Sequence, residues 1–217
     1  MNEEENLPVI VRGIKNSLKS AEILICEGPS KDDSARIADE LAKDPKVSVI
    51  HMKERGYGRA VKTGLKEAKT DKVVVMMSDL SDDPKDLPKI VEKLDDHDVV
   101  IGSRFVKGGK MNNYPFMKHV ANRAFNNFAR ILFGYPYKDT TNSFKGYRKE
   151  ILNDIELESN DFDVTAELLL KAHRKGCRIT EVPVTWTNRV AGKANLNLRR
   201  VGGKYLRTVL KTRFGKT

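Results

Sequence analysis

Lys72-Val-Val-Val-Met-Met-Ser-Asp-Leu-Ser-Asp-Asp-Pro84 is the stretch that decides the fold, because a mostly apolar run ends abruptly in a cluster of carboxylates. Residues 72–77 predict a buried strand, and the acidic residues mark its carboxyl end. Asp83, followed by Pro84, predicts the N-cap of a helix over residues 84–94. A strand, an acidic loop and a helix in this order form one unit of an α/β fold.

The same unit occurs twice before this stretch. Residues 22–26 and 47–50 predict short strands, and each is followed by a turn-rich loop and a helix. Residues 98–102 predict a further strand, which leads into Ser103 and Arg104. Strands that alternate with helices predict a mostly parallel sheet flanked by helices, in which ligands bind at the carboxyl ends of the strands.

The chain opens with an amphipathic helix rather than a strand, and its second half is less regular. The later elements are expected in this order: a helix over 116–133, a helix over 164–175, a strand over 177–186, a polar loop over 187–195 and a last helix. We therefore divide the chain into an α/β domain, residues 1–195, and a basic amphipathic C-terminal helix, residues 196–217.

Composition narrows the class of protein. The 217 residues carry a net charge of +10 and contain two cysteines without metal-type spacing. No stretch approaches the roughly 20 consecutive apolar residues of a membrane-spanning helix, and the acidic first residues do not resemble a signal peptide. We expect a cytoplasmic protein with reduced cysteines.

The positive charge is concentrated at the C-terminus, since no acidic residue follows Glu181. In the last helix an apolar face is expected opposite a basic one; the apolar face carries Leu198, Val201, Tyr205 and Val209, and the basic face carries Arg200, Lys204, Arg207 and Lys211. Such a helix can lie peripherally at the inner face of an anionic membrane. Two alternatives are a helix packed on its own domain and, less favoured, a nucleic-acid-binding tail; no nucleic-acid-binding motif accompanies the tail.

The acidic cluster is the leading candidate for chemistry. Carboxylate and hydroxyl oxygens at a strand end suit Mg²⁺ or Mn²⁺ bound to a diphosphate, so Asp79, Ser81 and Asp82 are the candidate metal ligands. The metal would stabilise the charge that develops on a departing nucleoside diphosphate. One of the aspartates could instead be only a helix cap.

Several basic residues stand in loops that could bind phosphate. Arg55 and Gly56 open a glycine-rich loop, Arg104 follows a strand, and Arg189 and Lys193 flank a glycine. The guanidinium group is well shaped for phosphate. The competing interpretation of each is a surface cation.

Together these segments resemble the inverting glycosyltransferases of family 2, with GT-A fold, and in particular the polyprenyl- and dolichyl-phosphate sugar synthases. The resemblance extends over nearly the whole chain and rests on a set of motifs in order: 2–8, Arg55-Gly-Tyr-Gly58, 73–84, Val100-Ile-Gly-Ser-Arg104, 139–148, Phe162-Asp-Val-Thr-Ala-Glu167, and Glu181-Val-Pro-Val-Thr-Trp186 followed by 189–193.

The resemblance implies roles for individual residues. Asp79 matches the second aspartate of the family's metal motif, whereas the first falls on Met77. Glu27 is the carboxylate left in the loop that holds the nucleoside. The family's usual first strand is missing, because this chain starts at the equivalent of the loop that follows it, Asn2-Glu3.

The resemblance also implies the reaction. A hexose, mannose or glucose, would pass from a nucleotide-diphosphate sugar to a polyprenyl or dolichyl phosphate at the membrane surface, with Ser143 and the basic loops near the phosphate groups. Asp79 and Arg104 would act in catalysis, and Glu167 would be the base if the acceptor were a hydroxyl. A homo-oligomer is possible. The alternative is an inactive transferase-like module that binds a nucleotide or a partner, which the departures at Met77 and at the first strand favour.

Overall fold

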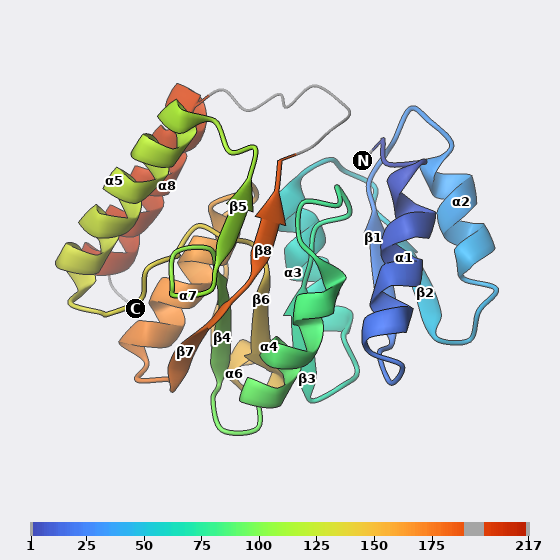
Figure 1. Ribbon diagram of the computed structural model, residues 1–217, viewed down its shortest axis with the longest axis horizontal. Helices are drawn as coiled ribbons and strands as arrows, with labels where there is room; N and C mark the ends of the chain where they lie inside the picture. The colour runs from blue at the N-terminus through green and yellow to red at the C-terminus, as the bar shows by residue number, and fades with distance from the viewer. Residues whose placement is uncertain (1, 189–197, 216–217) are drawn as a thin grey trace.

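The computed structural model describes residues 2–188 and 198–215, and the fold is α/β with helices on both sides of the strands, as predicted (Figure 1). The strands are β1 Ile23–Glu27, β2 Val47–His51, β3 Lys72–Val75, β4 Val99–Ser103, β5 Lys110–Asn112, β6 Lys145–Arg148, β7 Ile179–Pro183 and β8 Thr185–Thr187. The helices are α1 Asn6–Ser17, α2 Ser34–Leu41, α3 Tyr57–Glu67, the 3₁₀ turn η1 Pro84–Asp86, α4 Leu87–Lys93, α5 Phe116–Phe133, α6 Lys149–Leu152, α7 Val164–Arg174 and α8 Leu198–Phe214.

The strands form three sheets rather than one continuous sheet. β1 pairs in parallel with β2, and β5 pairs in parallel with β8. The central sheet has the order β3-β6-β4-β7, in which β6 is antiparallel to both neighbours and β4 is parallel to β7. β3 and β4 therefore point the same way, and their carboxyl ends lie at the same edge of the central sheet.

The break between β1 and β3 is where the fold departs most from a continuous sheet. Among the described residues, β1 is paired only with β2, and the outer edge of β3 has no strand beside it. All four residues of β3 are only half-buried, whereas all five of β4, which is paired on both sides, are buried. The β1–β2 sheet and the central sheet therefore each have one edge at this position that is not hydrogen-bonded to another described strand.

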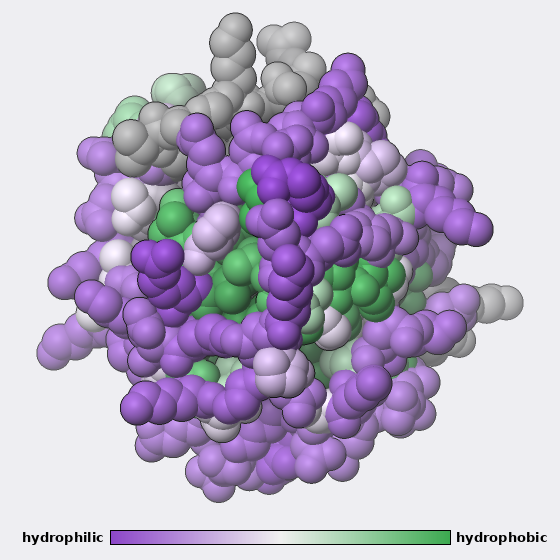
Figure 2. All heavy atoms as spheres, turned by 90° about the vertical axis from the view of Figure 1, so that its right-hand side faces the viewer, coloured by the Kyte–Doolittle hydropathy of each residue, from purple (hydrophilic) through white to green (hydrophobic). Residues whose placement is uncertain are grey.

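Helix α1 joins the two sheets in place of strand pairing. Ile14 of α1 and Met76 beyond β3 pack against both the core between α1, α2 and the β1–β2 sheet and the core between α4 and the central sheet. The opening amphipathic helix, unexpected for a parallel α/β fold, thus fastens the β1–β2 unit by side-chain packing. Figure 2 views this side and shows apolar atoms in hollows between hydrophilic ridges.

The main core lies between the central sheet and helix α7, eight of whose residues are buried. Helices α5 and α8 lie side by side at the opposite end of the molecule from α1 and α2 (Figure 1). Val209 of α8 is fully buried against Ala129, Tyr135 and Leu170, and the Tyr205 hydroxyl donates a hydrogen bond to the carbonyl oxygen of Phe162 at 2.8 Å. Tyr205 and Val209 belong to the face of the last helix that was predicted to meet lipid. They pack on the protein's own domain instead, because the domain has an apolar site at this position.

Some predicted boundaries were wrong for local reasons. β3 ends at Val75 rather than at residue 77, because its partner β6 begins at Lys145, which is paired with Val75. The predicted strand over 177–186 is two strands interrupted at Val184. Residues 110–112, for which no strand was predicted, form β5. The helix over 116–133 was predicted with its observed bounds.

No helix in the described ranges, 2–188 and 198–215, combines the length and apolar character needed to cross a membrane. The boundary proposed between residues 195 and 196 lies outside the described residues and stays a prediction.

Gly58 on α3 is a position where backbone approach demands glycine. A Cβ there would lie 2.5 Å from the carbonyl carbon of Asn160 and 2.6 Å from the nitrogen of Asp161. We expect Gly58→Ala to lower the free energy of unfolding by about 1–3 kcal/mol, measured by urea denaturation, since backbone must move to admit the methyl group. Gly203→Ala in α8, where a Cβ meets no atom within 4 Å, is the matched control and should be neutral or stabilising. Equal losses in both variants would contradict this explanation.

Candidate active site

The acidic loop after β3 is folded back on itself. Asp79 Oδ1 accepts hydrogen bonds from the backbone nitrogen of Ser81 at 3.1 Å and from the Ser81 hydroxyl at 2.6 Å. Asp83 caps η1 by accepting from the nitrogen of Lys85 at 3.0 Å, as the sequence predicted. Asp83 therefore serves as a cap, whereas the side-chain oxygens of Asp79 and Ser81 lie together and could act as metal ligands.

Asp82 is the member of the cluster in the least favourable surroundings. Its side chain is 2% exposed, and neither carboxylate oxygen makes a hydrogen bond of ordinary geometry with a described residue. Burial, and then the negative charge of Asp79, raise the pKa of Asp82 to about 7. A cation placed beside the two carboxylates would relieve both effects.

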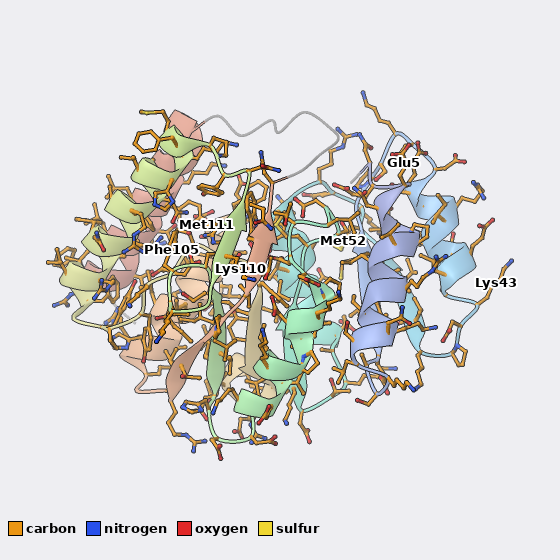
Figure 3. The ribbon with its side chains drawn as sticks, viewed as in Figure 1. Glu5, Lys43, Met52, Phe105, Lys110 and Met111 are labelled. Atoms are coloured by element: carbon orange, nitrogen blue, oxygen red, sulfur yellow. The ribbon has the colours of Figure 1, made fainter. Side chains whose placement is uncertain are left out.

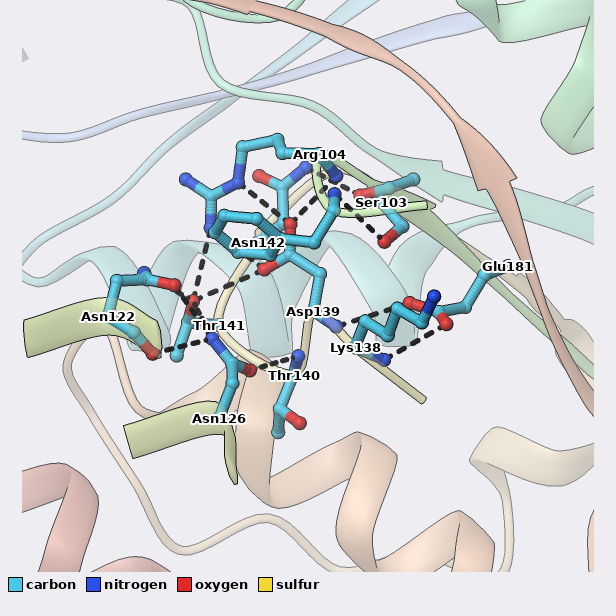
Figure 4. Close-up of polar contacts among 12 residues, drawn as sticks. Ser103, Arg104, Asn122, Asn126, Lys138, Asp139, Thr140, Thr141, Asn142 and Glu181 are labelled. Carbon is cyan, nitrogen blue, oxygen red and sulfur yellow. Dashed lines mark hydrogen bonds and ion pairs between the residues drawn. The ribbon is translucent and has the colours of Figure 1, made fainter. Parts of the chain in front are cut away.

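Arg104, at the carboxyl end of β4, forms a buried bidentate ion pair with Asp139 (Figure 4). Nε donates to Oδ2 and Nη2 donates to Oδ1, each at 2.8 Å, and the backbone nitrogen of Arg104 also donates to Oδ2 at 3.0 Å. Burial alone would lower the pKa of Arg104, but Asp139 outweighs burial and raises it. Burial would likewise raise the pKa of Asp139, yet Arg104 holds it below its usual value.

Aromatic rings surround the guanidinium group of Arg104. Its Cζ lies 5.4 Å from the ring centroid of Phe105, 5.8 Å from that of Tyr114 and 5.9 Å from that of Trp186. Phe105 lies between β4 and α5 (Figure 3). With Nε and Nη2 held by Asp139, the predicted contact of Arg104 with phosphate depends on the remaining donors of this side chain and stays a prediction.

Lys145, in β6, is a buried basic residue that the sequence analysis did not single out. Its side chain is 0% exposed, and Nζ donates to the carbonyl oxygens of Thr140, at 2.9 Å, and Asn142. It therefore shapes the loop that carries Asp139 and Ser143. The sequence held a signal for each residue. For Lys145 it was a lysine between Phe144 and Gly146 in a strand pattern, and for Asp139 it was the run of polar residues 139–143.

Burial, only partly offset by Asp139, lowers the pKa of Lys145 from 10.5 to about 7. Between these values an unfolded chain holds a proton that the native protein has lost, so stability should rise with pH from about 7 to 10.5, by at most about 1.4 kcal/mol per pH unit. Urea denaturation at pH 7.5 and 9 should show this rise, and Lys145→Met should flatten it. Lys43→Met, at an exposed site (Figure 3), is the control and should keep it; an unchanged slope in Lys145→Met would contradict the assignment.

The residues predicted to bind the nucleotide sugar lie at the carboxyl end of β1 and in the loop after β2. Glu27, at the end of β1, is 8% exposed; its Oε1 makes no hydrogen bond with a described residue, and Oε2 lies 3.6 Å from Nδ1 of His51. Arg55 is exposed and its Nε donates to the carbonyl oxygen of Pro29 at 3.1 Å. Gly56 has φ +144°, which favours glycine, and precedes α3.

Tyr57 and Ser143 extend the cluster around the acidic loop. Burial, and the nearby charges of Asp82 and Asp79, raise the pKa of Tyr57, and the Ser143 hydroxyl lies close enough to offset part of this effect. Ser143 is buried. The structure therefore brings together Asp79, Asp82 and Ser143, and it adds Tyr57, for which the sequence analysis predicted no role.

Glu167, proposed as a base for a hydroxyl acceptor, has another task in the structure. Its carboxylate accepts hydrogen bonds from the backbone nitrogens of Glu158, at 3.0 Å, and Ser159, at 2.8 Å, and pairs with Lys171 at 2.7 Å. Burial alone would raise the pKa of Glu167, but Lys171 and the two backbone donors lower it. This arrangement holds the loop 157–163, and the role of Glu167 as a base for a hydroxyl acceptor stays a prediction.

The described residues contain no group of three histidine, cysteine, aspartate or glutamate side chains that could hold a metal ion by themselves. The two carboxylates and the hydroxyl of Asp79, Asp82 and Ser81 could supply part of a coordination shell, with phosphate oxygens and water completing it. The predicted phosphate-binding residues Arg189 and Lys193 lie outside the described residues.

Among curated proteins, the chain is 35% identical over 214 residues to a dolichol-phosphate mannosyltransferase of Pyrococcus furiosus, covering 96% of this chain and 60% of that protein. It is 32% identical over 204 residues to an undecaprenyl-phosphate mannosyltransferase of Micrococcus luteus, covering 90% of this chain and 84% of that protein. The chain thus spans less than two thirds of the length of the first of these relatives.

Solved structures share the fold at lower sequence identity. Glucosyl-3-phosphoglycerate synthase from Mycobacterium tuberculosis, in complex with Mn²⁺, UDP-glucose and phosphoglyceric acid, matches with a TM-score of 0.72 at 18% identity, covering 98% of this chain and 76% of that one. The family described as Glycosyl transferase family 2 matches residues 1–156. With that match and relatives above 30% identity, the chain belongs to glycosyl transferase family 2.

Proposed function

We propose that the protein transfers a hexose, mannose or glucose, from a nucleotide-diphosphate sugar to a polyprenyl phosphate, with Mg²⁺ or Mn²⁺ bound at the acidic loop after β3. The observation that carries the proposal is the pairing of Asp79 with Ser81 beside the buried carboxylate of Asp82. The relatives named as dolichol- and undecaprenyl-phosphate mannosyltransferases support the acceptor class.

The residues of the acidic loop fit a divalent cation. Carboxylates and a hydroxyl are hard oxygen donors of the kind that Mg²⁺ and Mn²⁺ prefer. Asp82 keeps two buried oxygens without hydrogen bonds of ordinary geometry to the described residues, and burial and the charge of Asp79 raise its pKa, an effect that Arg104 offsets only in part. A bound ion would neutralise the charge that develops on the leaving diphosphate.

The acceptor needs little activation by the protein. A phosphate monoester is already ionised near neutral pH, so its oxyanion can attack the anomeric carbon directly as the bond to the diphosphate breaks, with inversion. Catalysis then consists of positioning and charge stabilisation. Asp79 and Asp82 serve the donor side, while Ser143 and the free donors of Arg104 serve the phosphate groups, together with Arg189 and Lys193.

Contact with the membrane follows from the acceptor. A polyprenyl phosphate stays in the bilayer, so the enzyme must work at its surface, and α8 presents the basic residues that favour peripheral binding. The cytoplasmic location and a homo-oligomeric state stay predictions.

The direct experiment is a transfer assay with GDP-mannose, UDP-glucose and related donors, a polyprenyl phosphate and Mn²⁺. We expect one donor to yield a polyprenyl-phospho-sugar, and chelation of the metal to stop its formation. Absence of product with every donor, under conditions in which the protein is folded, would refute the proposal.

Two observations favour a second candidate, an inactive module that binds a nucleotide. The sheets holding β1 and β3 are not joined by a ladder within the described residues, and Met77 stands where the family motif has its first aspartate. Calorimetry with GDP- and UDP-sugars separates the two candidates, because binding without any transfer or hydrolysis would support the module.

A further inference from the structure

Strand β8 is hydrogen-bonded both to β5 and to the acidic loop after β3. In the loop, Asp82 lies opposite Trp186 of β8 in an antiparallel bridge. The bridge is flanked by two backbone hydrogen bonds, one from the nitrogen of Thr187 to the carbonyl oxygen of Ser81 at 2.8 Å and one from the nitrogen of Asp83 to the carbonyl oxygen of Thr185 at 3.3 Å. β8 therefore fixes the backbone of the loop that carries the proposed metal ligands.

The bridge also brings two side chains together. Residues directly opposite each other in an antiparallel pair project to the same face, and they are closest where the hydrogen bonds belong to the neighbouring residues, as they do here. The indole ring of Trp186 is therefore on the face that carries the buried carboxylate of Asp82. Burial raises the pKa of Asp82, and the charge of Arg104 offsets part of that rise, so this guanidinium group is also close.

The ring of Trp186 reaches Arg104. Its centroid lies 5.9 Å from Cζ of the guanidinium group, within the range of a cation–π contact. The ring of Tyr114 meets that of Trp186 edge-on, with centroids 5.0 Å apart, and lies 5.8 Å from the same Cζ. Asp139 holds two nitrogens of the guanidinium group, and the two rings pack against it in addition. Trp186 thus contacts the acidic loop through its backbone and Arg104 through its ring.

We propose that Trp186 is a positioning residue of the transfer reaction, which holds Arg104 at a fixed place relative to the metal ligands of the acidic loop. The inference rests on the proposed function, in which the cation meets the donor diphosphate and Arg104 meets the attacking phosphate. Two anions must then be held in line for the reaction, and a small change in their spacing lowers the rate. The sequence analysis predicted no role for Trp186, because its partners are brought to it by the fold.

Transfer kinetics with Mn²⁺ and geranyl phosphate, a water-soluble prenyl phosphate, provide the test. We expect Trp186→Leu to raise the KM for geranyl phosphate at least about tenfold, because Arg104 loses the ring that places it. Mn²⁺ binding together with a nucleotide should stay within about twofold, since the backbone hydrogen bonds of β8 remain. Trp186→Phe keeps a ring and should return the KM to within about threefold of the parent value. Phe133→Leu, which removes a half-buried ring at the end of α5, is the matched control and should keep the parent KM.

A purely structural role of Trp186 predicts a different result. Loss of folded protein in Trp186→Leu would lower kcat and leave the KM for geranyl phosphate at the parent value, and that result would overturn the proposal. So would a KM in Trp186→Phe as high as in Trp186→Leu, or an equal rise in Phe133→Leu.

Binding can also be followed without turnover, because Trp186 is the only tryptophan of the chain. Geranyl phosphate should change the tryptophan emission of the parent protein, since the anion alters the charge around the guanidinium group beside the ring; no change would contradict the proposal. If emission changes and Trp186→Leu binds geranyl phosphate more weakly in calorimetry, but no donor yields a product, the proposed function fails and the placement of Arg104 by Trp186 stands. Transfer by Trp186→Leu with the parent KM refutes this inference and leaves the proposed function intact.

Discussion

Replacing Asp79 with alanine is expected to lower sugar transfer by at least about 10²–10³-fold. The side chain accepts a hydrogen bond from the Ser81 hydroxyl at 2.6 Å and lies in the acidic loop after β3, which also carries the buried Asp82, so it belongs to the oxygen ligands proposed for the cation. A radiolabelled-donor assay measures the effect at saturating Mn²⁺.

Two further variants separate charge from loop structure. Asp79→Asn keeps an oxygen that can accept from Ser81 but removes the charge, and it should be nearly as inactive as the alanine variant. Asp83→Asn keeps the helix cap that Asp83 forms with Lys85 and should retain activity within a few-fold. Full activity of Asp79→Asn, or equal losses at Asp79 and Asp83, would contradict the assignment.

Replacing Asp139 with asparagine is expected to lower the free energy of unfolding by about 3–5 kcal/mol. The substitution leaves the guanidinium of Arg104, whose side chain is 6% exposed, without its counter-charge in the protein interior. Urea denaturation at neutral pH measures the loss. The exposed pair between Arg36 and Glu40 is the matched control, and Glu40→Gln should cost less than about 1 kcal/mol.

A double variant tests whether the loss comes from the uncompensated charge. Arg104→Met/Asp139→Leu removes both charges together and should cost less than the sum of the two single substitutions. Additive losses would mean that the two side chains act separately, against the bidentate geometry.

Sequence patterns were sufficient where one segment determines its own structure. Helix α5 was predicted with its observed bounds, since its apolar periodicity is continuous and Gly134, with φ +69°, ends it. Asp83 was predicted as a cap because capping depends on residues two or three positions away. The α/β class followed from the alternation of such segments.

Features that depend on distant partners could not be predicted. Arg104 and Asp139 are 35 positions apart, and only the fold pairs them. The same holds for Lys145, whose role depends on the carbonyl groups it meets, and for Val209, whose burial depends on α5 and α7. The sequence pattern of α8 is equally compatible with lipid and with a protein core. Val209 is buried because α5 and α7 form an apolar site beside it, which the sequence of α8 does not reveal.

The central claim is that the carboxylate of Asp79 recruits a divalent ion to the pyrophosphate of a bound nucleotide. Electron paramagnetic resonance of Mn²⁺, titrated with the protein in the presence of GDP or UDP, tests it most directly. We predict that the parent protein binds Mn²⁺ together with one of the nucleotides and that Asp79→Asn weakens this binding at least about tenfold. Equal Mn²⁺ binding by both proteins, or binding that no nucleotide improves, would contradict the claim.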